Sequence, residues 1–296
     1  MDTRLKISIQ SPRKENLTGR QQRFLGAIID QIERSNFCVL PDSRSTAGIE
    51  ERSHKIAHCH GVVVLAFSQW ECRRLSRDEK KAVIFPTEFA HIGAVLATAT
   101  RRPLLVLREK SVAERGVLRP GYVPVISLPN SLDVEWLKSE GFQREFREWV
   151  EHVSAYKHVF VGYSSQATEV AHILYKFLNE KLKVTVFDWH DFQTGETIWQ
   201  SIERAERLTS CGIFLFMADD PVTSGNLQHY APRDNVVYEA GYFVGAKGLS
   251  RSIIVYEEGA KVPTDLGGIL HLPLGSRQSI ATIETALAER LGRLIV

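Results

Sequence analysis

Polar side chains follow three of the apolar, strand-like segments in the second half of the sequence, and others lie around the start of a helix. The residues concerned, with the aromatic residues beside them, are Tyr163, Ser164, Ser165, Asp188, Trp189, Asp219, Asp220, Arg233, Asn235 and Glu239. Ligands of open parallel sheets bind at the carboxyl ends of the strands, on the loops that follow them. We therefore expect these residues to surround a ligand at one edge of a sheet.

Glu239 is the side chain of this set best suited to catalysis. When a glycosidic bond breaks, positive charge develops on the sugar ring, and a fixed carboxylate can stabilise that charge or attack the ring as a nucleophile. The rings of Tyr163 and Trp189 are suited to stacking on a base or on a nicotinamide ring. The pattern alone also allows structural roles: a Glu in the first turn of a helix favours the helix dipole, and Asp219 and Asp220 fit a solvated turn.

The elements that must position these residues alternate between strand and helix along the whole chain. Apolar segments typical of strands lie at 6–10, 37–40, 61–67, 103–109, 158–165, 183–189, 211–220 and 252–258. Patterns of helical period lie between them, at 20–35, 48–58, 87–100, 168–182, 196–210 and 235–248. The alternation predicts an α/β fold with two flavodoxin-like, doubly wound domains, each with a mainly parallel sheet flanked by helices.

Both halves follow the same order of elements, and the length of the chain also suits two domains. We expect the first domain over 1–135, a linker helix over 136–156 and the second domain over 157–296. In each half a Glu opens a helix after a segment expected to be a loop: Glu88 in the first half and Glu239 in the second. This parallel is the most informative feature of the chain.

The composition excludes several classes of protein. The 296 residues include 37 Lys and Arg against 35 Asp and Glu, and no apolar run reaches the roughly 18–20 residues of a membrane helix. The N-terminus has no signal-peptide pattern, and four scattered cysteines do not indicate a disulfide framework. We therefore expect a cytoplasmic protein with no membrane partner.

The charge is unevenly divided between the halves. Residues 1–150 hold 24 Lys and Arg against 18 Asp and Glu, so the first half is basic and the second is acidic. This suits an anionic small ligand, but no basic stripe with interleaved aromatic residues indicates a nucleic acid as partner. His54 and His58 are four residues apart without a paired CxxC or HExxH motif, so no metal site is expected.

Several motifs of the second half occur together in one known family. The sequence RDNVVYEAGYFVGAKG, followed by a strand and then KVPTDLGGI, resembles the signature of bacterial TIR-like, predicted nucleotide-binding domains. VFVGYSS, the strand ending at Asp188 and Trp189, TGETI and the LFMADD strand end also resemble that family, so the resemblance covers about 157–274. It implies a TIR-like fold for the second domain.

The resemblance also implies an activity, the cleavage of NAD+ at the nicotinamide–ribose bond. Carried over by position, Glu239 is the catalytic carboxylate. The residues implied to line the NAD+ pocket or to order its loops are Tyr163, Ser164, Ser165, Asp188, Trp189, Asp219, Arg233 and Asn235. No GxGxxG fingerprint follows the first strand of this half, which favours NAD+ as substrate over NAD+ as a bound cofactor.

The first half is similar to nucleoside 2-deoxyribosyltransferase-type domains. The resemblance rests on GVVVLAF, on EFAHIGAVLATATRRP and on LLVL. In that family a Glu at the start of this helix is the nucleophile, and Glu88, with Gly93 after it, has that place here. The family usually has an Asp-rich loop before this helix, whereas this chain has a long, basic segment over 68–87.

The basic segment suggests that the first domain binds a nucleotide without reacting with it. The residues expected to sense the ligand are Glu88, Arg73, Arg74 and Arg77, and the three arginines can pair with phosphate groups through parallel hydrogen bonds. TIR-like domains of this family are often fused to modules that sense a nucleotide second messenger in antiphage systems. The alternative is that this segment is only a solvated loop, or that it docks on the acidic second half.

Together these observations predict a sensor joined to an effector. The N-terminal domain would bind a nucleotide second messenger, and the C-terminal domain would then hydrolyse NAD+, with activation through self-association into an oligomer or filament. Two other functions stay open. The chain could be a nucleotide-binding signalling protein without catalysis, or a nucleoside deoxyribosyltransferase that uses Glu88.

Overall fold

The computed structural model describes residues 2–41, 48–73, 82–224 and 227–295, and the chain divides into two compact units. The N-terminal unit is Arg4–Ala155, and the C-terminal unit begins at Tyr156 and also includes the residues before Arg4. Each unit contains one five-stranded sheet in which every strand pairing is parallel. The prediction of two doubly wound α/β domains is confirmed.

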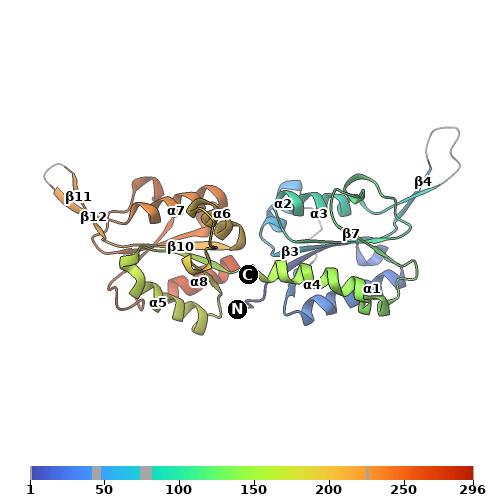
Figure 1. Cartoon of the computed structure of the whole chain (residues 1–296), viewed down its shortest axis with the longest axis horizontal. Coiled ribbons are helices and arrows are strands. Elements are labelled where there is room, and N and C mark those ends of the chain that lie inside the picture. Colours follow the sequence, from blue (N-terminus) through green and yellow to red (C-terminus); the bar gives the residue numbers. More distant parts are fainter. Residues whose placement is uncertain (1, 42–47, 74–81, 225–226, 296) are drawn as a thin grey trace. The chain divides into compact units, whose positions relative to one another are not determined.

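The N-terminal unit has the strand order β2-β1-β3-β6-β7. Its strands are β1 (Lys6–Gln10), β2 (Cys38–Val39), β3 (Gly61–Ala66), β4 (Trp70–Cys72), β5 (Val83–Phe85), β6 (Leu104–Glu109) and β7 (Val125–Leu128). Its α-helices are α1 (Gly19–Arg34), α2 (Ile49–Ala57), α3 (Glu88–Ala99) and α4 (Glu140–Ser154). Helices α1 and α4 cover one face of the sheet, and α2 and α3 cover the other (Figure 1).

The C-terminal unit has the strand order β14-β13-β10-β8-β9. Its strands are β8 (Val159–Gly162), β9 (Val186–Phe187), β10 (Cys211–Phe216), β11 (Asp220–Ser224), β12 (Leu227–Ala231), β13 (Ser252–Glu257) and β14 (Leu270–Leu274). Its α-helices are α5 (Thr168–Lys176), α6 (Ile198–Leu208), α7 (Asp234–Lys247) and α8 (Glu284–Ile295). Helices α5 and α8 lie on one face, and α6 and α7 on the other (Figure 1).

The two units repeat the same topology. Numbered along the chain within each unit, the main sheet has the order 2-1-3-4-5, which is the flavodoxin-like order. Each unit also has an antiparallel hairpin between its third strand and the next helix: β4 with β5 in the N-terminal unit, and β11 with β12 in the C-terminal unit. The expectation that these two segments are loops is therefore wrong, because each forms a ladder that local sequence patterns do not reveal.

Local sequence explains where several elements begin and why they are buried. Helix α1 starts with a capping box in which the side chains of Thr18 and Gln21 each accept a hydrogen bond from the other's backbone N–H. Thr197 and Gln200 form the same box at α6. The strands β3 and β10 are apolar runs and are buried at every position, as expected for the centre of a sheet covered on both faces.

Helix α4, which lies in the segment predicted as a linker, packs within the N-terminal unit. Its apolar face, formed by Phe142, Phe146, Trp149 and Val153, is buried in the same cluster as α1 and the strands. Phe146 and Trp149 have ring centroids 5.7 Å apart. The helix therefore contributes to the core of this unit.

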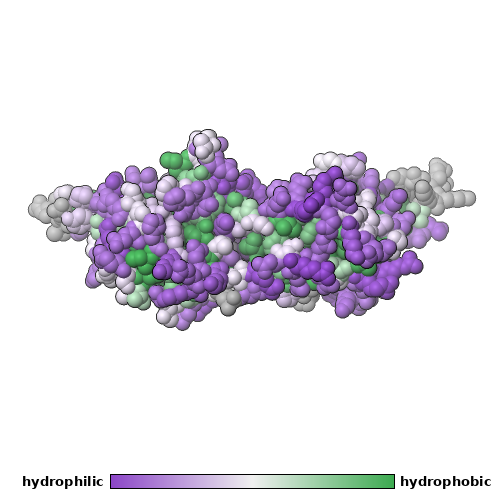
Figure 2. Space-filling model, turned by 60° about the horizontal axis from the view of Figure 1, so that its bottom comes forward, coloured by the Kyte–Doolittle hydropathy of each residue, from purple (hydrophilic) through white to green (hydrophobic). Residues whose placement is uncertain are grey.

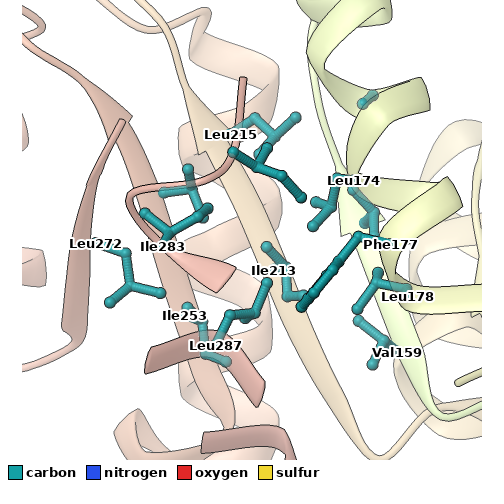
Figure 3. Close-up of a cluster of buried hydrophobic side chains, with 14 of the residues drawn as sticks. Val159, Leu174, Phe177, Leu178, Ile213, Leu215, Ile253, Leu272, Ile283 and Leu287 are labelled. Carbon is teal, nitrogen blue, oxygen red and sulfur yellow. The ribbon is translucent and has the colours of Figure 1, made fainter. Parts of the chain in front are cut away.

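The core of the C-terminal unit is divided by the sheet. On one face, side chains of β8, β10, β13 and β14 pack against α5 and α8, and Ile213, Phe177 and Leu287 lie at the centre of this cluster (Figure 3). On the other face, Phe160 of β8 and Phe214 of β10 pack against Phe243 of α7. The alternation of side chains along each strand sends neighbouring residues to opposite faces.

The surface is mixed in character. The face shown in Figure 2 is largely hydrophilic, and hydrophobic residues occur on it in scattered small groups. Over the described parts of the chain, no helix combines the length and the apolar content that crossing a membrane requires.

Leu287→Ala is expected to destabilise the C-terminal unit by about 2–5 kcal/mol, because removing a fully buried leucine side chain leaves a cavity in a packed core. Urea denaturation measures the change. Leu249→Ala is the control, since Leu249 is 46% exposed and its loss should cost much less. Equal losses of stability in the two variants would contradict the described core.

Candidate active site

The end of β8 connects three parts of the predicted site. Gly162, the last residue of β8, faces α7 and lies against the carboxyl group of Glu239. Tyr163 accepts a hydrogen bond from Trp189 Nε1 at 2.5 Å, and Ser164 donates one to Asp219 Oδ2 at 2.5 Å. The three consecutive residues at the end of β8 therefore contact Glu239, Trp189 and Asp219, which lie far apart in the sequence.

Glu239 is the sixth residue of α7, so it lies beyond the first turn, and the helix dipole does not account for its position. Its Oε2 atom is buried and has no hydrogen-bond partner among the described residues. Burial raises the pKa of Glu239 to about 7. At neutral pH the carboxyl group is therefore divided between its neutral and its charged form.

An apolar layer of aromatic rings lies beside the carboxyl group of Glu239. Phe160 and Phe243 stack with ring centroids 4.9 Å apart, and Phe214 packs edge-on against Phe243 at 5.3 Å. Phe160 and Gly162 are two residues apart on β8 and face the same side of the sheet, toward α7. The carboxyl group of Glu239 thus lies at the outer end of a hydrophobic cluster.

A network of charged groups holds the loop that follows β10. The Asp219 side chain is only 1% exposed and pairs with Arg277, whose Nη2 lies 3.2 Å from Asp219 Oδ1. Arg277 also donates to Glu257, from Nε to Oε1 at 2.9 Å and from Nη2 to Oε2 at 2.5 Å. Glu257 Oε2 accepts a hydrogen bond from the backbone N–H of Ala218 at 2.8 Å. The interpretation of Asp219 as part of a solvated turn is therefore wrong, since a cation from a distant loop covers it.

The hydrogen bonds of this network also set the charge of Glu257. The hydrogen bonds from Arg277 lower the pKa of Glu257, and Glu257 in turn raises the pKa of Arg277. Both groups are ionised at neutral pH. Ser164 and Asp219 are predicted to line the NAD+ pocket. In the structure they belong to the hydrogen-bonded network that holds the loop after β10.

Aromatic residues lie on the side of β8 opposite to Glu239. The rings of Tyr163 and Tyr175 meet edge to face with centroids 6.0 Å apart, and burial raises the pKa of the Tyr175 hydroxyl. Trp189 is 55% exposed, and its ring centroid lies 3.7 Å from that of His190, with the two rings tilted by 31°. Asp188 caps the short turn of Trp189–Asp191 by accepting a hydrogen bond from the N–H of His190 at 2.8 Å.

The remaining predicted residues are exposed and make local contacts. Arg233 precedes α7 and pairs with Asp220 at 3.5 Å, and both side chains are well exposed. The backbone N–H of Asn235 donates to Asp234 Oδ1 at 2.8 Å. Ser165 begins a short helical turn and accepts a hydrogen bond from Thr168 Oγ1 at 2.8 Å. The structure does not connect Ser165 or Asn235 directly to Glu239.

Sequence reasoning missed three residues of this site. Glu257 ends β13, so the rule that placed the other candidates after strands could have found it. Arg277 follows β14 within a loop and carries no local signal. Gly162 is an unremarked residue of an apolar strand, and its importance depends on the helix that covers it.

The N-terminal unit does not repeat the position of Glu239. Glu88 is the first residue of α3 and is exposed, whereas Glu239 is the sixth residue of α7, so the predicted parallel between the two glutamates is wrong. Gly93, not Glu88, is the sixth residue of α3.

Of the predicted phosphate-binding residues, Arg73 is exposed after β4, and Arg74 and Arg77 lie outside the described residues.

A glutamate at the end of the fourth strand of the main sheet has the same role in both units. Glu109 ends β6 as Glu257 ends β13, and its Oε2 accepts a hydrogen bond from the backbone N–H of Ser68 at 2.8 Å. Ser68 and Ala218 each lie two residues after the third strand of their unit. Where Glu257 binds a cation, Glu109 accepts a hydrogen bond from Gln21 Nε2 at 3.2 Å.

Comparison with known proteins identifies the family that part of this unit matches. The family model described as "CAP12/Pycsar effector protein, TIR domain" matches residues 158–276, which include Glu239 and the other residues predicted to bind NAD+. Residues 158–276 are a TIR domain of this family. The resemblance predicted from the motifs over 157–274 is confirmed, and Arg277 lies immediately beyond the matched part of the TIR domain.

Several known proteins are similar to part of this chain. CD-NTase-associated protein 12 from Lachnospiraceae bacterium (strain RUG226) is 34% identical over 113 residues, which are 38% of this chain and 35% of that protein. Pycsar effector protein BcPycTIR from Burkholderia cepacia is 32% identical over 118 residues, or 39% of each chain. Pycsar effector protein PaPycTIR from Pseudomonas aeruginosa is 28% identical over 193 residues, or 60% of each chain. The matches thus span from about a third to three fifths of the relatives' length.

Glu239→Gln is expected to stabilise the TIR domain above neutral pH, because burial penalises the charged carboxylate. A pKa that rises from 4.5 to about 7 on folding means that the folded state holds the proton more tightly, so stability falls as pH rises between these values. Since one unit of pKa equals about 1.36 kcal/mol, the glutamine variant should gain about 3 kcal/mol at pH 8. Denaturation curves at pH 4 and pH 8 test this. A gain of the same size at both values would contradict the buried, partnerless carboxyl group.

Arg277→Met is expected to lower the stability of the TIR domain by about 2–3 kcal/mol at pH 7, because Asp219 and Glu257 lose their cation. The partial exposure of Arg277 and Glu257 keeps the loss below that of a fully buried pair. Arg277 lowers the pKa of Glu257 in the folded state, so the difference between the proteins should shrink as pH falls below 4.5. Lys181→Met, which breaks an exposed pair with Glu284, is the control and should cost less than about 1 kcal/mol.

Proposed function

We propose that the C-terminal TIR domain hydrolyses NAD+ to nicotinamide and ADP-ribose, with Glu239 as the catalytic carboxylate. The observation that supports this most directly is the carboxyl group itself. It lies beside the carboxyl end of a central parallel strand, where ligands of this fold bind, and its Oε2 atom is buried without a hydrogen-bond partner among the described residues. No cation in the described parts of the chain pairs with Glu239, so its carboxylate is available to a positively charged reaction centre.

The reaction needs this charge at one step. The bond between the ribose C1′ atom and the nicotinamide nitrogen breaks, and nicotinamide leaves as a neutral molecule with the bonding electron pair. The sugar ring is left with oxocarbenium character, which the Glu239 carboxylate stabilises, and water then adds at C1′ and releases a proton. Because the surroundings of Glu239 are apolar, the attraction between these charges is stronger than in water.

The other residues have supporting roles in this proposal. The exposed ring of Trp189, held by its hydrogen bond to Tyr163, offers a surface on which the nicotinamide or adenine ring can stack. Asp188 orders the turn that carries Trp189. Ser164 and Asp219 shape the loop after β10, while Ser165, Arg233 and Asn235 are exposed and available to the polar parts of NAD+.

We further propose that the N-terminal unit senses a nucleotide second messenger. The sequence predicts this sensing domain over residues 1–135. The relatives are named CD-NTase-associated and Pycsar effector proteins, which is consistent with a role downstream of nucleotide signalling in defence against phages. Arg73, Arg74 and Arg77 are the proposed phosphate-binding residues. Ligand binding would promote self-association into an oligomer or filament in the cytoplasm, with no nucleic acid or membrane as partner.

Nucleoside deoxyribosyltransferase activity has less support. A nucleophilic Glu88 would need to face a pocket over the sheet, whereas Glu88 is exposed at the first position of α3. The position equivalent to Glu239 is Gly93. We therefore assign catalysis to the C-terminal unit alone.

Glu239→Gln should abolish NAD+ consumption, since the amide keeps the shape of the side chain but cannot carry the negative charge. A loss of at least about 100-fold in kcat is expected for removing the main electrostatic group. Glu88→Gln is the matched control and should retain wild-type turnover. Chromatography of nicotinamide and ADP-ribose after incubation with NAD+ measures both variants, each alone and with a panel of cyclic mono-, di- and trinucleotides.

Turnover that requires one nucleotide of the panel would support the sensor assignment and identify the activator. Equal turnover with and without nucleotides at all protein concentrations would contradict it. Activity that survives in Glu239→Gln but is lost in Glu88→Gln would overturn the assignment of catalysis to the TIR domain.

A further inference from the structure

The carboxyl group of Glu239 occupies a space that any side chain at position 162 would fill. An ideal Cβ placed on Gly162 would overlap Glu239 Oε2, and it would also come within 2.8 Å of Phe214 Cδ1. Carbon atoms do not approach other heavy atoms this closely without a shift of one partner. The absence of a side chain at the end of β8 is thus what leaves room for the carboxyl group.

The N-terminal unit has the two equivalent positions, but there the strand residue has the large side chain and the helix residue is the glycine. Gln10 ends β1 as Gly162 ends β8, and Gly93 has the place in α3 that Glu239 has in α7. An ideal Cβ on Gly93 would come within 2.6 Å of Gln10 Cγ. In each unit, therefore, one of the two facing positions is a glycine, and the other position supplies the side chain that fills the space between strand and helix.

We propose that Gly162 is a positioning residue for catalysis by Glu239, and that the reversed pair leaves the N-terminal unit without a carboxylate at this place. The large side chain comes from the helix in the C-terminal unit and from the strand in the N-terminal unit. Gln10 is neutral, and its Nε2 donates to Ser8 Oγ at 2.8 Å. This proposal rests on the proposed function for its catalytic readout, but its geometric part does not.

The charged groups on the elements around α7 have other partners. Glu206 on α6 pairs with Lys247 at 3.0 Å, Arg204 pairs with Glu196 at 3.1 Å, Arg233 pairs with Asp220, and Arg251 donates to backbone carbonyls of Ser210 and Leu294. On β13, Glu257 binds Arg277. None of these groups, nor Glu203 and Arg207 of α6, contributes to the raised pKa of Glu239, which burial alone causes.

Gly162→Ala should therefore displace the carboxyl group instead of unfolding the domain. The atom of Glu239 that meets the new methyl group is the end of a flexible side chain, which can turn away toward solvent. A displacement of about 1 Å in a reacting group can reduce kcat by about 100-fold. Because the displaced carboxyl group is better hydrated, its pKa should fall from about 7 toward the ordinary value of 4.5.

Gly212→Ala is a matched control on the neighbouring strand. An ideal Cβ at Gly212 would come within 2.6 Å of Phe214 Cζ and 2.9 Å of Phe243 Cδ1, so it disturbs the same aromatic layer. It has no contact with Glu239 among the three nearest atoms. This variant separates general damage to the core from displacement of the carboxyl group.

The test combines turnover with a direct titration of Glu239. The full chain labelled with ¹³C at glutamate Cδ is titrated by NMR, and the Glu239 signal is assigned by its loss in Glu239→Gln. We expect Gly162→Ala to lower the pKa of Glu239 by one unit or more and to reduce kcat about 100-fold, while Gly212→Ala leaves the pKa unchanged. An unchanged pKa in folded Gly162→Ala, or equal effects in the two alanine variants, would overturn the proposal.

Two further outcomes are distinguishable. If the wild type consumes no NAD+ under any condition, the proposed function fails, and the titration still decides the role of Gly162. If Gly162→Ala does not fold, Gly162→Ala/Glu239→Ala decides it. Recovery of a folded protein in the double variant supports the proposal, because the methyl group then has the space of the lost carboxyl group, and failure of both variants to fold overturns it.

Discussion

The burial of Glu239 Oε2, for which the described part of the chain supplies no compensating cation, is the constraint on which the C-terminal unit depends. Holding Glu239 against an apolar layer disfavours its charged form, and a pKa near 7 corresponds to about 3 kcal/mol of stability given up above neutral pH. A domain whose net stability is typically about 5–15 kcal/mol can tolerate that loss only if the rest of its core is well packed. The two hydrophobic clusters, one on each face of the sheet, provide that packing.

The charged groups of this edge divide into two kinds. Asp219, Arg277 and Glu257 neutralise one another and bind the backbone at Ala218, so they hold the end of β10 in place. Glu239 has no such partner among the described residues. Paired charges are suited to fixing a structure, whereas an unpaired carboxylate in apolar surroundings is suited to meeting a positive charge on a substrate.

The two units show how one architecture can carry different side chains at the same place. They share strand order, the hairpin before the main helix, and a glutamate at the end of the fourth strand that binds the backbone after the third. They differ where strand and helix meet: Gly162 faces Glu239 in one unit, and Gln10 faces Gly93 in the other. Whether the helix or the strand supplies the larger side chain decides if a carboxylate stands at the sheet edge.

The sequence by itself determined the parallel α/β architecture of both units and the TIR domain, because strand runs, helical periods and ordered motifs are local patterns. Only the tertiary structure decided which groups meet. Asp219 is buried by Arg277, 58 residues away, Glu88 does not correspond to Glu239, and two expected loops are hairpins. Gly162 matters only because α7 packs over it and places the side chain of Glu239 against it. Such contacts join residues that are distant in the chain, and local periodicity contains no information about the partner across the sheet.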